Sequence, residues 1–176
     1  VANLRIGVAG HNLFDIARAV GDLGVITPDN FLAAARKTAL IRDLNPTAPT
    51  LEGYLFPSTY RITRHTTAEQ LCRLMIAEFR RVWKELGGTN AASTVTLASL
   101  VEKETAVPAE RATVASVYYN RLESGMPLQC DPTTIYAALL ENRYQGTIFR
   151  SDLASQNAYN TYVHPGLPPG PIANPG

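Results

Sequence analysis

The sequence predicts a mainly α-helical fold with a small β-containing part at its N-terminus. Two observations predict this class. Apolar side chains recur at helical spacing through most of the chain, with capping residues or prolines where these stretches start and glycines near their ends. Only near the N-terminus do apolar residues alternate, at Leu4, Ile6 and Val8, in the way that is typical of a half-buried strand.

Two helices are expected after this strand. Asn12 can cap the first, and Thr27 with Pro28 can open the second, because proline is tolerated in the first turn of a helix. Residues 45–60 contain several prolines and predict irregular chain. The apolar stripe of the first helix comprises Leu13, Ile16, Ala17 and Val20.

The clearest helix is expected over residues 67–86. Thr66 and Glu69 fit a capping box at its start, and Gly87 and Gly88 would end it. The pattern assigns its apolar stripe to core packing. That stripe comprises Leu71, Leu74, Met75, Phe79, Val82, Trp83 and Leu86.

Further helices are expected over about residues 94–105, from Pro108 to just before Gly125, and from Asp131, which we take as a helix cap. Residues 166–176 are rich in proline and glycine, so they cannot form a regular helix or a central strand.

Composition excludes several classes of protein. Hydrophobic residues make up 45% and charged residues 18% of the chain, as in ordinary folded domains. A net charge of +1 without a basic stripe argues against a nucleic-acid-binding protein. No apolar run approaches the roughly 20 residues that a membrane span needs. Cys72 and Cys130 are too few for a disulfide framework or a zinc site, and we expect two free, buried thiols.

Glu104 is the acidic residue that the pattern singles out. On a helix, Leu97, Leu100 and Val101 share its face, whereas Glu102 points to nearly the opposite side. Shelter beside this apolar stripe would disfavour the ionised form, so the Glu104 side chain could hold a proton near neutral pH. A carboxyl of this kind can protonate the leaving oxygen when a glycosidic bond breaks.

The pattern alone leaves a second interpretation open. Glu104 would then simply end a helix and pair with a cation, and ion pairs of this kind are common. The cations within reach along the sequence are Lys103, Arg111 and Arg121.

Longer blocks of sequence carry a family resemblance. These blocks are residues 51–60, 102–106, 119–122, 125–133, 158–162 and 166–176. In this order, they resemble the endolytic murein transglycosylase (YceG-like) family. Ser58 departs from the family pattern, which usually has Asp at this place.

The resemblance implies a lysozyme-like helical catalytic core with Glu104 as its acid/base. We also expect a set of substrate-binding residues. The amide and phenol groups among them supply neutral hydrogen bonds that suit sugar hydroxyls, and Glu52 could be a second acid in the cleft. For most of them the alternative is support of an irregular loop, and for the glutamate it is a structural role in its Glu-Gly turn. The candidates are Glu52, Gln129, Thr133, Tyr159 and Asn160.

The activity implied is cleavage of the β-1,4 bond between N-acetylmuramic acid and N-acetylglucosamine in peptidoglycan strands, leaving 1,6-anhydro ends, without a metal or cofactor. A lysozyme-like hydrolase and a non-catalytic peptidoglycan-binding or scaffold module are the alternatives. The resemblance also implies the cell-wall synthesis machinery as a partner. It places the protein in the bacterial envelope, at the outer face of the cytoplasmic membrane.

The expected organisation is a small N-terminal α/β segment, residues 1–50, followed by the catalytic domain, residues 51–176. Compared with the family pattern, we expect the catalytic domain to be cut short at its C-terminus. The membrane anchor and the LysM-like region that the resemblance implies would belong to the full-length protein and lie outside this chain.

Overall fold

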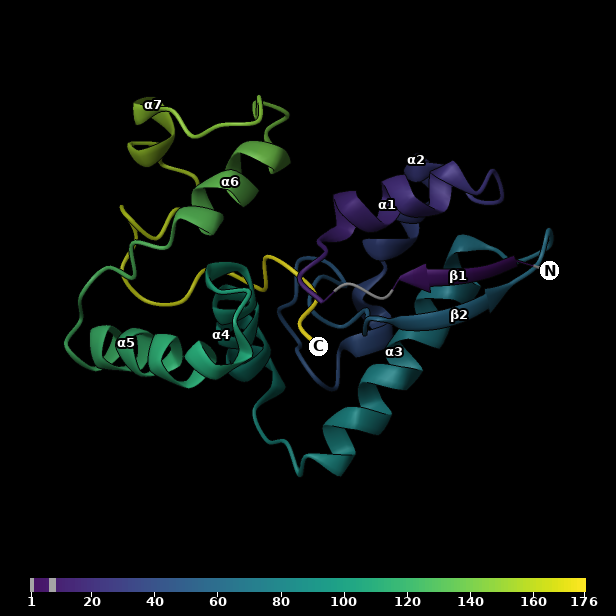
Figure 1. The fold of residues 1–176 in the computed structure, drawn as a ribbon, viewed down its shortest axis with the longest axis horizontal. Coiled ribbons are helices and arrows are strands. Elements are labelled where there is room, and N and C mark those ends of the chain that lie inside the picture. The colour runs from purple at the N-terminus through teal and green to yellow at the C-terminus, as the bar shows by residue number, and fades with distance from the viewer. Residues whose placement is uncertain (1, 7–8) are drawn as a thin grey trace.

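The computed structural model describes residues 2–6 and 9–176, and it is mainly α-helical as predicted (Figure 1). The elements are β1 (Ala2–Ile6), α1 (Leu13–Asp22), α2 (Pro28–Ala35), a 3-10 helix (Thr38–Ile41), β2 (Ser58–Ile62), α3 (Ala68–Glu85), α4 (Ala91–Glu104), a second 3-10 turn (Pro108–Glu110), α5 (Arg111–Glu123), α6 (Asp131–Leu140) and α7 (Arg150–Leu153).

The β part is an antiparallel pair of strands. β1 pairs with β2 in a register that runs from Ala2 opposite Ile62 to Ile6 opposite Ser58. The predicted strand near the N-terminus is therefore present, although Val8 and the side chains of β1 lie outside the described residues. β2 was not predicted, because its short alternating pattern follows directly after a proline-rich segment.

The first two helices begin where the sequence predicts. The Asn12 side chain accepts hydrogen bonds from the backbone N–H groups of Phe14 and Asp15, both at 3.0 Å. The Asp15 carboxylate accepts the N–H of Asn12 at 3.1 Å, which completes a capping box. In α2, Thr27 is the cap and Pro28 is the first helical residue, as expected.

The capping box of α3 lies one residue later than predicted. Thr67 and Gln70 form it, with hydrogen bonds of 2.9 and 3.2 Å. Thr66 instead accepts the backbone N–H of Thr63 at 2.8 Å, so its hydroxyl belongs to the preceding turn. Gly87, at φ 63°, follows the end of the helix as expected.

The predicted apolar stripe of α3 is only partly buried. Leu71, Met75 and Phe79 are in the core, but Leu74 and Leu86 are 47% and 75% exposed. The prediction that these two leucines join the core is therefore wrong. Helical spacing gives the width of an apolar face but not the extent of the surface that covers it.

The start of α6 also differs from the prediction. Cys130 is the N-cap residue and Asp131 is the first residue of the helix. The Asp131 carboxylate accepts a hydrogen bond from the Tyr162 hydroxyl instead of capping the backbone. Its negative charge in the first turn remains favourable for the helix dipole.

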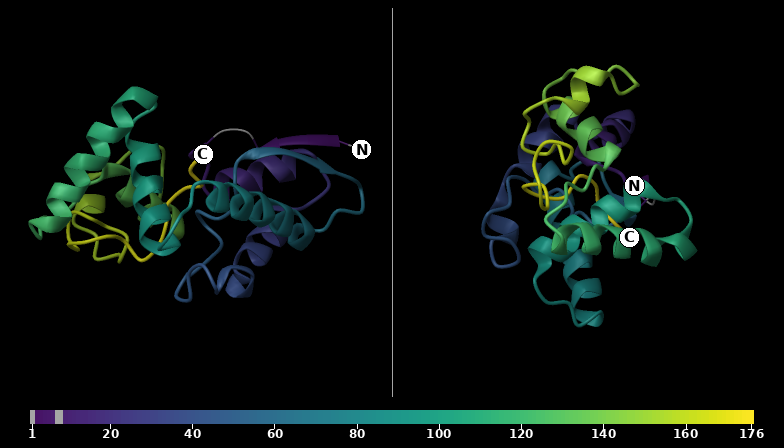
Figure 2. Two further views of the ribbon diagram at one scale, coloured as in Figure 1. Left: turned by 90° about the horizontal axis from the view of Figure 1, so that it is seen from below. Right: turned by 90° about the vertical axis from the view of Figure 1, so that its left-hand side faces the viewer.

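The residues of the two apolar cores lie in two groups of elements that stand side by side, and the C-terminus lies where these groups meet (Figures 1 and 2). The first is formed by α1, α2, α3 and the start of α4, and it also includes Leu51 and Tyr54. The second is formed by the rest of α4 with α5, α6 and the C-terminal segment. Val95 belongs to the first core and Leu97 to the second, so one helix serves both. The domain boundary at residue 50 stays a prediction.

None of the helices in the described ranges combines the length and the apolar character that a membrane span requires.

Replacement of Leu100 by alanine should destabilise the protein by about 2–5 kcal/mol, because this fully buried side chain of α4 fills the second core. Leu74→Ala is the matched control, since the same change at a side chain that is 47% exposed should cost less than about 1 kcal/mol. Urea unfolding measures both free energies. Equal losses in the two variants would contradict the assignment of the core.

Candidate functional site

Glu104 is the last residue of α4, and it is exposed. One carboxylate oxygen, Oε2, accepts a hydrogen bond from the Tyr118 hydroxyl at 3.0 Å and lies 3.8 Å from the Cys130 thiol. The expectation that leucine and valine shelter this side chain is wrong. Leu100 and Val101 are buried, but the chain leaves the helix directly after Glu104, so the apolar stripe ends beneath the carboxyl and not around it.

The cations that the alternative interpretation offered to Glu104 are bound elsewhere. Arg111 forms a 2.9 Å ion pair with Glu102, whose side chain is 9% exposed. Lys103 donates to the carbonyl oxygen of Gly10 at 3.3 Å, and Arg121 donates to the carbonyl oxygen of Leu128. The two glutamates of α4 therefore have different partners, which agrees with the prediction that they face different sides.

Tyr118 and Cys130 both donate to Glu104, and both side chains are buried. Burial raises the pKa of the Cys130 thiol to about 12. Burial also raises the pKa of Tyr118 well above its ordinary value, and the neighbouring Cys130 and Glu104 add to this. Both groups therefore keep their protons at neutral pH, and Cys130 is a free, buried thiol as predicted.

Gln129 directly precedes Cys130 in the sequence and is exposed. Its backbone lies in the left-handed region, with φ 53°, which side chains other than glycine rarely adopt. Its N–H donates to the carbonyl oxygen of Thr161 at 3.1 Å, which holds the strained conformation in place. Strained residues of this kind are concentrated at functional sites.

Thr161 joins the segment around Gln129 to the Tyr159–Asn160 loop. Its hydroxyl accepts the N–H of Cys130 at 3.0 Å and lies 2.9 Å from the Thr133 hydroxyl. Thr133 in turn donates to the Cys130 carbonyl oxygen at 2.7 Å. Both threonines are buried, so the Thr133 side chain acts within the protein. Thr161 was not predicted as a site residue.

Asn160 organises its own loop through hydrogen bonds of its side chain. Its side-chain nitrogen donates to the carbonyl oxygens of Asp152, Leu153 and Ser155 at 3.2, 3.1 and 2.7 Å. The residue is fully buried, and its hydrogen bonds support the loop. Tyr159 is also buried, and its backbone N–H is held by the side chain of Asn157 at 3.0 Å.

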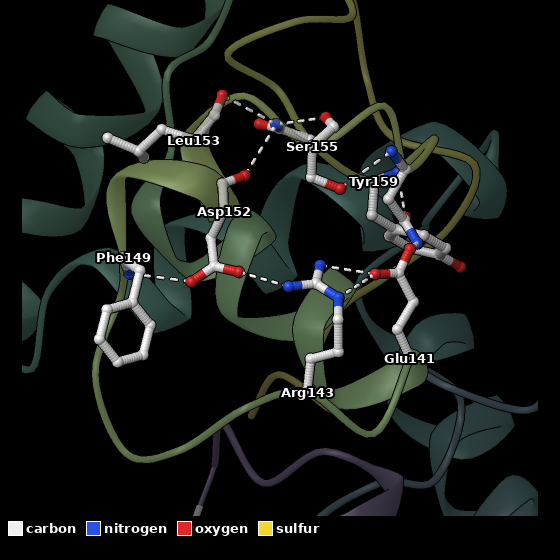
Figure 3. Close-up of polar contacts among 9 residues, drawn as sticks. Glu141, Arg143, Phe149, Asp152, Leu153, Ser155 and Tyr159 are labelled. Carbon is white, nitrogen blue, oxygen red and sulfur yellow. Dashed lines mark hydrogen bonds and ion pairs between the residues drawn. The ribbon is translucent and has the colours of Figure 1, made fainter.

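The connection between α6 and α7 is held by Asp152 and Arg143 (Figure 3). The Asp152 carboxylate accepts the N–H of Phe149 at 2.8 Å and a guanidinium N–H of Arg143 at 2.6 Å. Both hydrogen bonds stabilise the ionised form, so the pKa of Asp152 is lowered. Arg143 also contacts Glu141, which accepts a 2.8 Å hydrogen bond from Asn157. This network fixes the chain that leads into the Tyr159–Asn160 loop.

Glu52 lies away from the surface and is 2% exposed. Its Oε2 atom accepts the N–H of Leu13 and the hydroxyl of Tyr136, each at 2.9 Å. Its Oε1 atom accepts the side-chain N–H of Asn174 at 2.7 Å. Burial raises the pKa of Glu52 to about 8, although these hydrogen bonds oppose the shift.

The structure thus brings together Glu104, Gln129 and Thr133 with the loop that contains Tyr159 and Asn160. Their connections run through Cys130 and Thr161.

Glu52 belongs to a separate cluster, which reaches the loop through Tyr136, whose ring centroid lies 5.0 Å from that of Tyr159. Direct contact of each candidate residue with a substrate stays a prediction. Within residues 2–6 and 9–176, no three His, Cys, Asp or Glu side chains gather in a way that could hold a metal ion.

Three of the residues that connect the site were not predicted. Tyr118 lies at helical spacing within its segment, a pattern that indicates a helix but no particular function. Thr161 lies within the block 158–162, and nothing in the sequence distinguishes it from its neighbours. Asn174 lies within the C-terminal block, 166–176, and was not predicted on its own, yet its side chain accepts the N–H groups of Gly53 and Leu55 at 2.8 and 3.0 Å.

Comparison with known proteins relates this chain to one protein family. The model of the YceG-like family matches residues 7–176. The endolytic murein transglycosylase of Bacillus subtilis is 42% identical over 133 residues, which cover 72% of this chain and 36% of that protein. The endolytic murein transglycosylase of Streptococcus pneumoniae strain D39 is 34% identical over an alignment of 194 residues. This alignment covers 94% of this chain and 35% of that protein.

A solved structure agrees with these matches. The crystal structure of a YceG-like protein from Listeria monocytogenes superposes with a TM-score of 0.80 at 30% identity, covering 99% of this chain and 64% of that one. The chain spans about a third of the length of the curated relatives that it matches.

Replacement of Glu52 by glutamine should remove a decline of stability with pH. The pKa of Glu52 rises from its ordinary 4.5 to about 8 in the folded protein. Between these values the unfolded chain has lost a proton that the folded protein retains, so the free energy of unfolding falls as pH rises. The expected slope is up to about 1.4 kcal/mol per pH unit.

Urea unfolding at several pH values across this window measures the slope. Glu123→Gln, an exposed change at the end of α5, should keep the decline of the unaltered protein. An identical slope in Glu52→Gln would show that this carboxyl does not carry the effect.

Proposed function

Because the chain belongs to the YceG-like family, we propose that it carries the catalytic site of a peptidoglycan lytic transglycosylase. The observation that carries this proposal is the arrangement at Glu104. One carboxylate oxygen is held by two buried neutral donors, and the side chain is otherwise exposed at the end of α4. A carboxyl that is held through one oxygen while the rest of the side chain is exposed can form a hydrogen bond with an oxygen of a bound sugar.

The proposed reaction breaks the β-1,4 bond between N-acetylmuramic acid and N-acetylglucosamine. Glu104 donates its proton to the bridging oxygen as the bond breaks, and the sugar's own N-acetyl group stabilises the resulting cation. Glu104, now ionised, accepts the proton of the C6 hydroxyl, whose oxygen forms the new bond to the anomeric carbon. The product has a 1,6-anhydro end, and the carboxyl recovers its proton.

The proposed substrate-binding residues divide by exposure. Gln129 is exposed, so its amide is the candidate for direct contact with the glycan. Tyr159, Asn160 and Thr133 are buried and would shape the loop that receives the sugar. Glu52 would support this loop through Tyr136. In this proposal α4, α5 and α6 are the core of a lysozyme-like catalytic domain over residues 51–176.

The proposed substrate also indicates where the protein works. The curated relatives are named as enzymes of murein, the polymer of the bacterial cell envelope. We propose glycan strands as the substrate, the cell-wall synthesis machinery as a partner, and the outer face of the cytoplasmic membrane as the location.

Glu104→Gln should abolish the release of 1,6-anhydro products from isolated glycan strands, because an amide can neither donate the required proton nor accept one. Mass spectrometry of the digest measures the products. A hydrolase using the same carboxyl would give products that are heavier by one water. Binding of strands without any cleavage by the unaltered protein would support a non-catalytic binding module instead.

Glu102→Gln is the matched comparison for this variant. The Glu102 carboxylate pairs with Arg111, away from Tyr118 and Cys130, so its replacement should leave anhydro products in the digest. Loss of cleavage in Glu102→Gln with retention in Glu104→Gln would reverse the choice between the two glutamates.

Gln129→Gly should weaken glycan binding without unfolding the protein. Glycine relieves the left-handed conformation but removes the amide, so KM should rise about 3- to 10-fold while stability changes by less than about 1 kcal/mol. Asn142→Gly is the control, since Asn142 is exposed at the same φ of 53°. If both changes raise KM equally, the effect comes from the backbone and not from the Gln129 side chain.

A further inference from the structure

We propose that Tyr118 and Cys130 are positioning residues that hold the Oε2 atom of Glu104, so that Oε1 is the oxygen that exchanges protons with the substrate. The inference rests on the proposed function, because it assigns a task to each oxygen of the proposed acid/base. Within residues 2–6 and 9–176, the hydrogen bonds to this carboxyl go to Oε2, from the Tyr118 hydroxyl at 3.0 Å and from the Cys130 thiol at 3.8 Å.

The two donors are themselves held firmly. The Tyr118 ring is 4% exposed and belongs to the second core, so its hydroxyl has a defined position on α5. Cys130 is the N-cap residue of α6, and its backbone N–H donates to the Thr161 hydroxyl at 3.0 Å. The donors therefore come from two different elements, α5 and the start of α6, and meet at a carboxyl that ends a third, α4.

The hydrogen-bond chemistry decides where the proton of the neutral acid lies. When Tyr118 and Cys130 both donate to Oε2, a proton on that oxygen would oppose two donor hydrogens. The acid proton is therefore placed on Oε1. The same oxygen can give its proton to the bridging oxygen and later accept that of the C6 hydroxyl, while Oε2 remains bound throughout.

The donors are also suited to remain donors during catalysis. A tyrosine hydroxyl and a cysteine thiol are uncharged when protonated, and burial disfavours their ionised forms at this place. Neither competes with Glu104 for the proton that passes between enzyme and sugar. Their effect is to limit the rotation of the carboxyl group. A catalytic group that is held in one orientation towards the bound substrate lowers the activation barrier of the reaction.

Tyr118→Phe tests the inference, because it keeps the buried ring and removes only the hydroxyl. On isolated glycan strands, kcat should fall about 10-fold or more, whereas KM should stay within about 2-fold, since the hydroxyl does not touch the substrate. Tyr119→Phe is the matched control. This neighbouring tyrosine is 55% exposed, and the same change there should leave kcat as it is.

Cys130→Ala provides a second, independent variant. The thiol is the weaker donor and lies farther away, so kcat should fall less than in Tyr118→Phe, by about 2- to 5-fold. The double variant should lose more than either single variant. A drop in kcat with unchanged KM supports positioning, whereas a rise in KM with unchanged kcat would mean that Tyr118 serves substrate binding instead.

The outcomes separate this inference from the function beneath it. If the unaltered protein releases no anhydro products, the proposed function fails. If the unaltered protein and Tyr119→Phe cleave strands, Glu104→Gln does not, and Tyr118→Phe cleaves at the unaltered rate, the proposed function stands and the positioning role is overturned.

Discussion

The Glu52 carboxyl joins parts of the chain that are far apart in the sequence. It accepts hydrogen bonds from Leu13 at the start of α1, from Tyr136 in α6 and from Asn174 near the C-terminal end. Burial of an acidic group without a paired cation is costly, so these donors must all be in place. Asn174 in turn holds the backbone of Gly53. The two cores therefore meet around one carboxyl, whose hydrogen bonds require a single arrangement of the surrounding segments.

The candidate site depends on a second set of short contacts. Thr161 holds the segment that contains Gln129 and Cys130, and the Cys130 thiol lies beside Glu104. None of these groups is charged except Glu104 itself. Neutral donors can orient a carboxylate without the strong stabilisation of its ionised form that a cation would bring. This arrangement suits the alternation between acid and base that is proposed for Glu104.

The helices were largely predictable from the sequence because their signals are local. Caps such as Asn12 and Thr27 act within a few residues of themselves, and helical spacing needs no knowledge of the rest of the fold. The surroundings of Glu104 could not be predicted in this way. Its exposure depends on where α4 ends relative to α5, and the donors Tyr118 and Cys130 reach it across 14 and 26 residues. Contacts over such separations have no periodic pattern in the sequence.

The helix α4 contributes residues to both apolar cores, and this has a mechanical consequence. Its first half, with Val95, is embedded in one core, and its second half, from Leu97 onward, is embedded in the other. Sharp bends of an α-helix are usually found at proline, at glycine or at a bulge, and α4 is a continuous helix from Ala91 to Glu104 with neither proline nor glycine. A rotation of one core relative to the other would therefore be transmitted along α4 to its C-terminal end, where Glu104 lies.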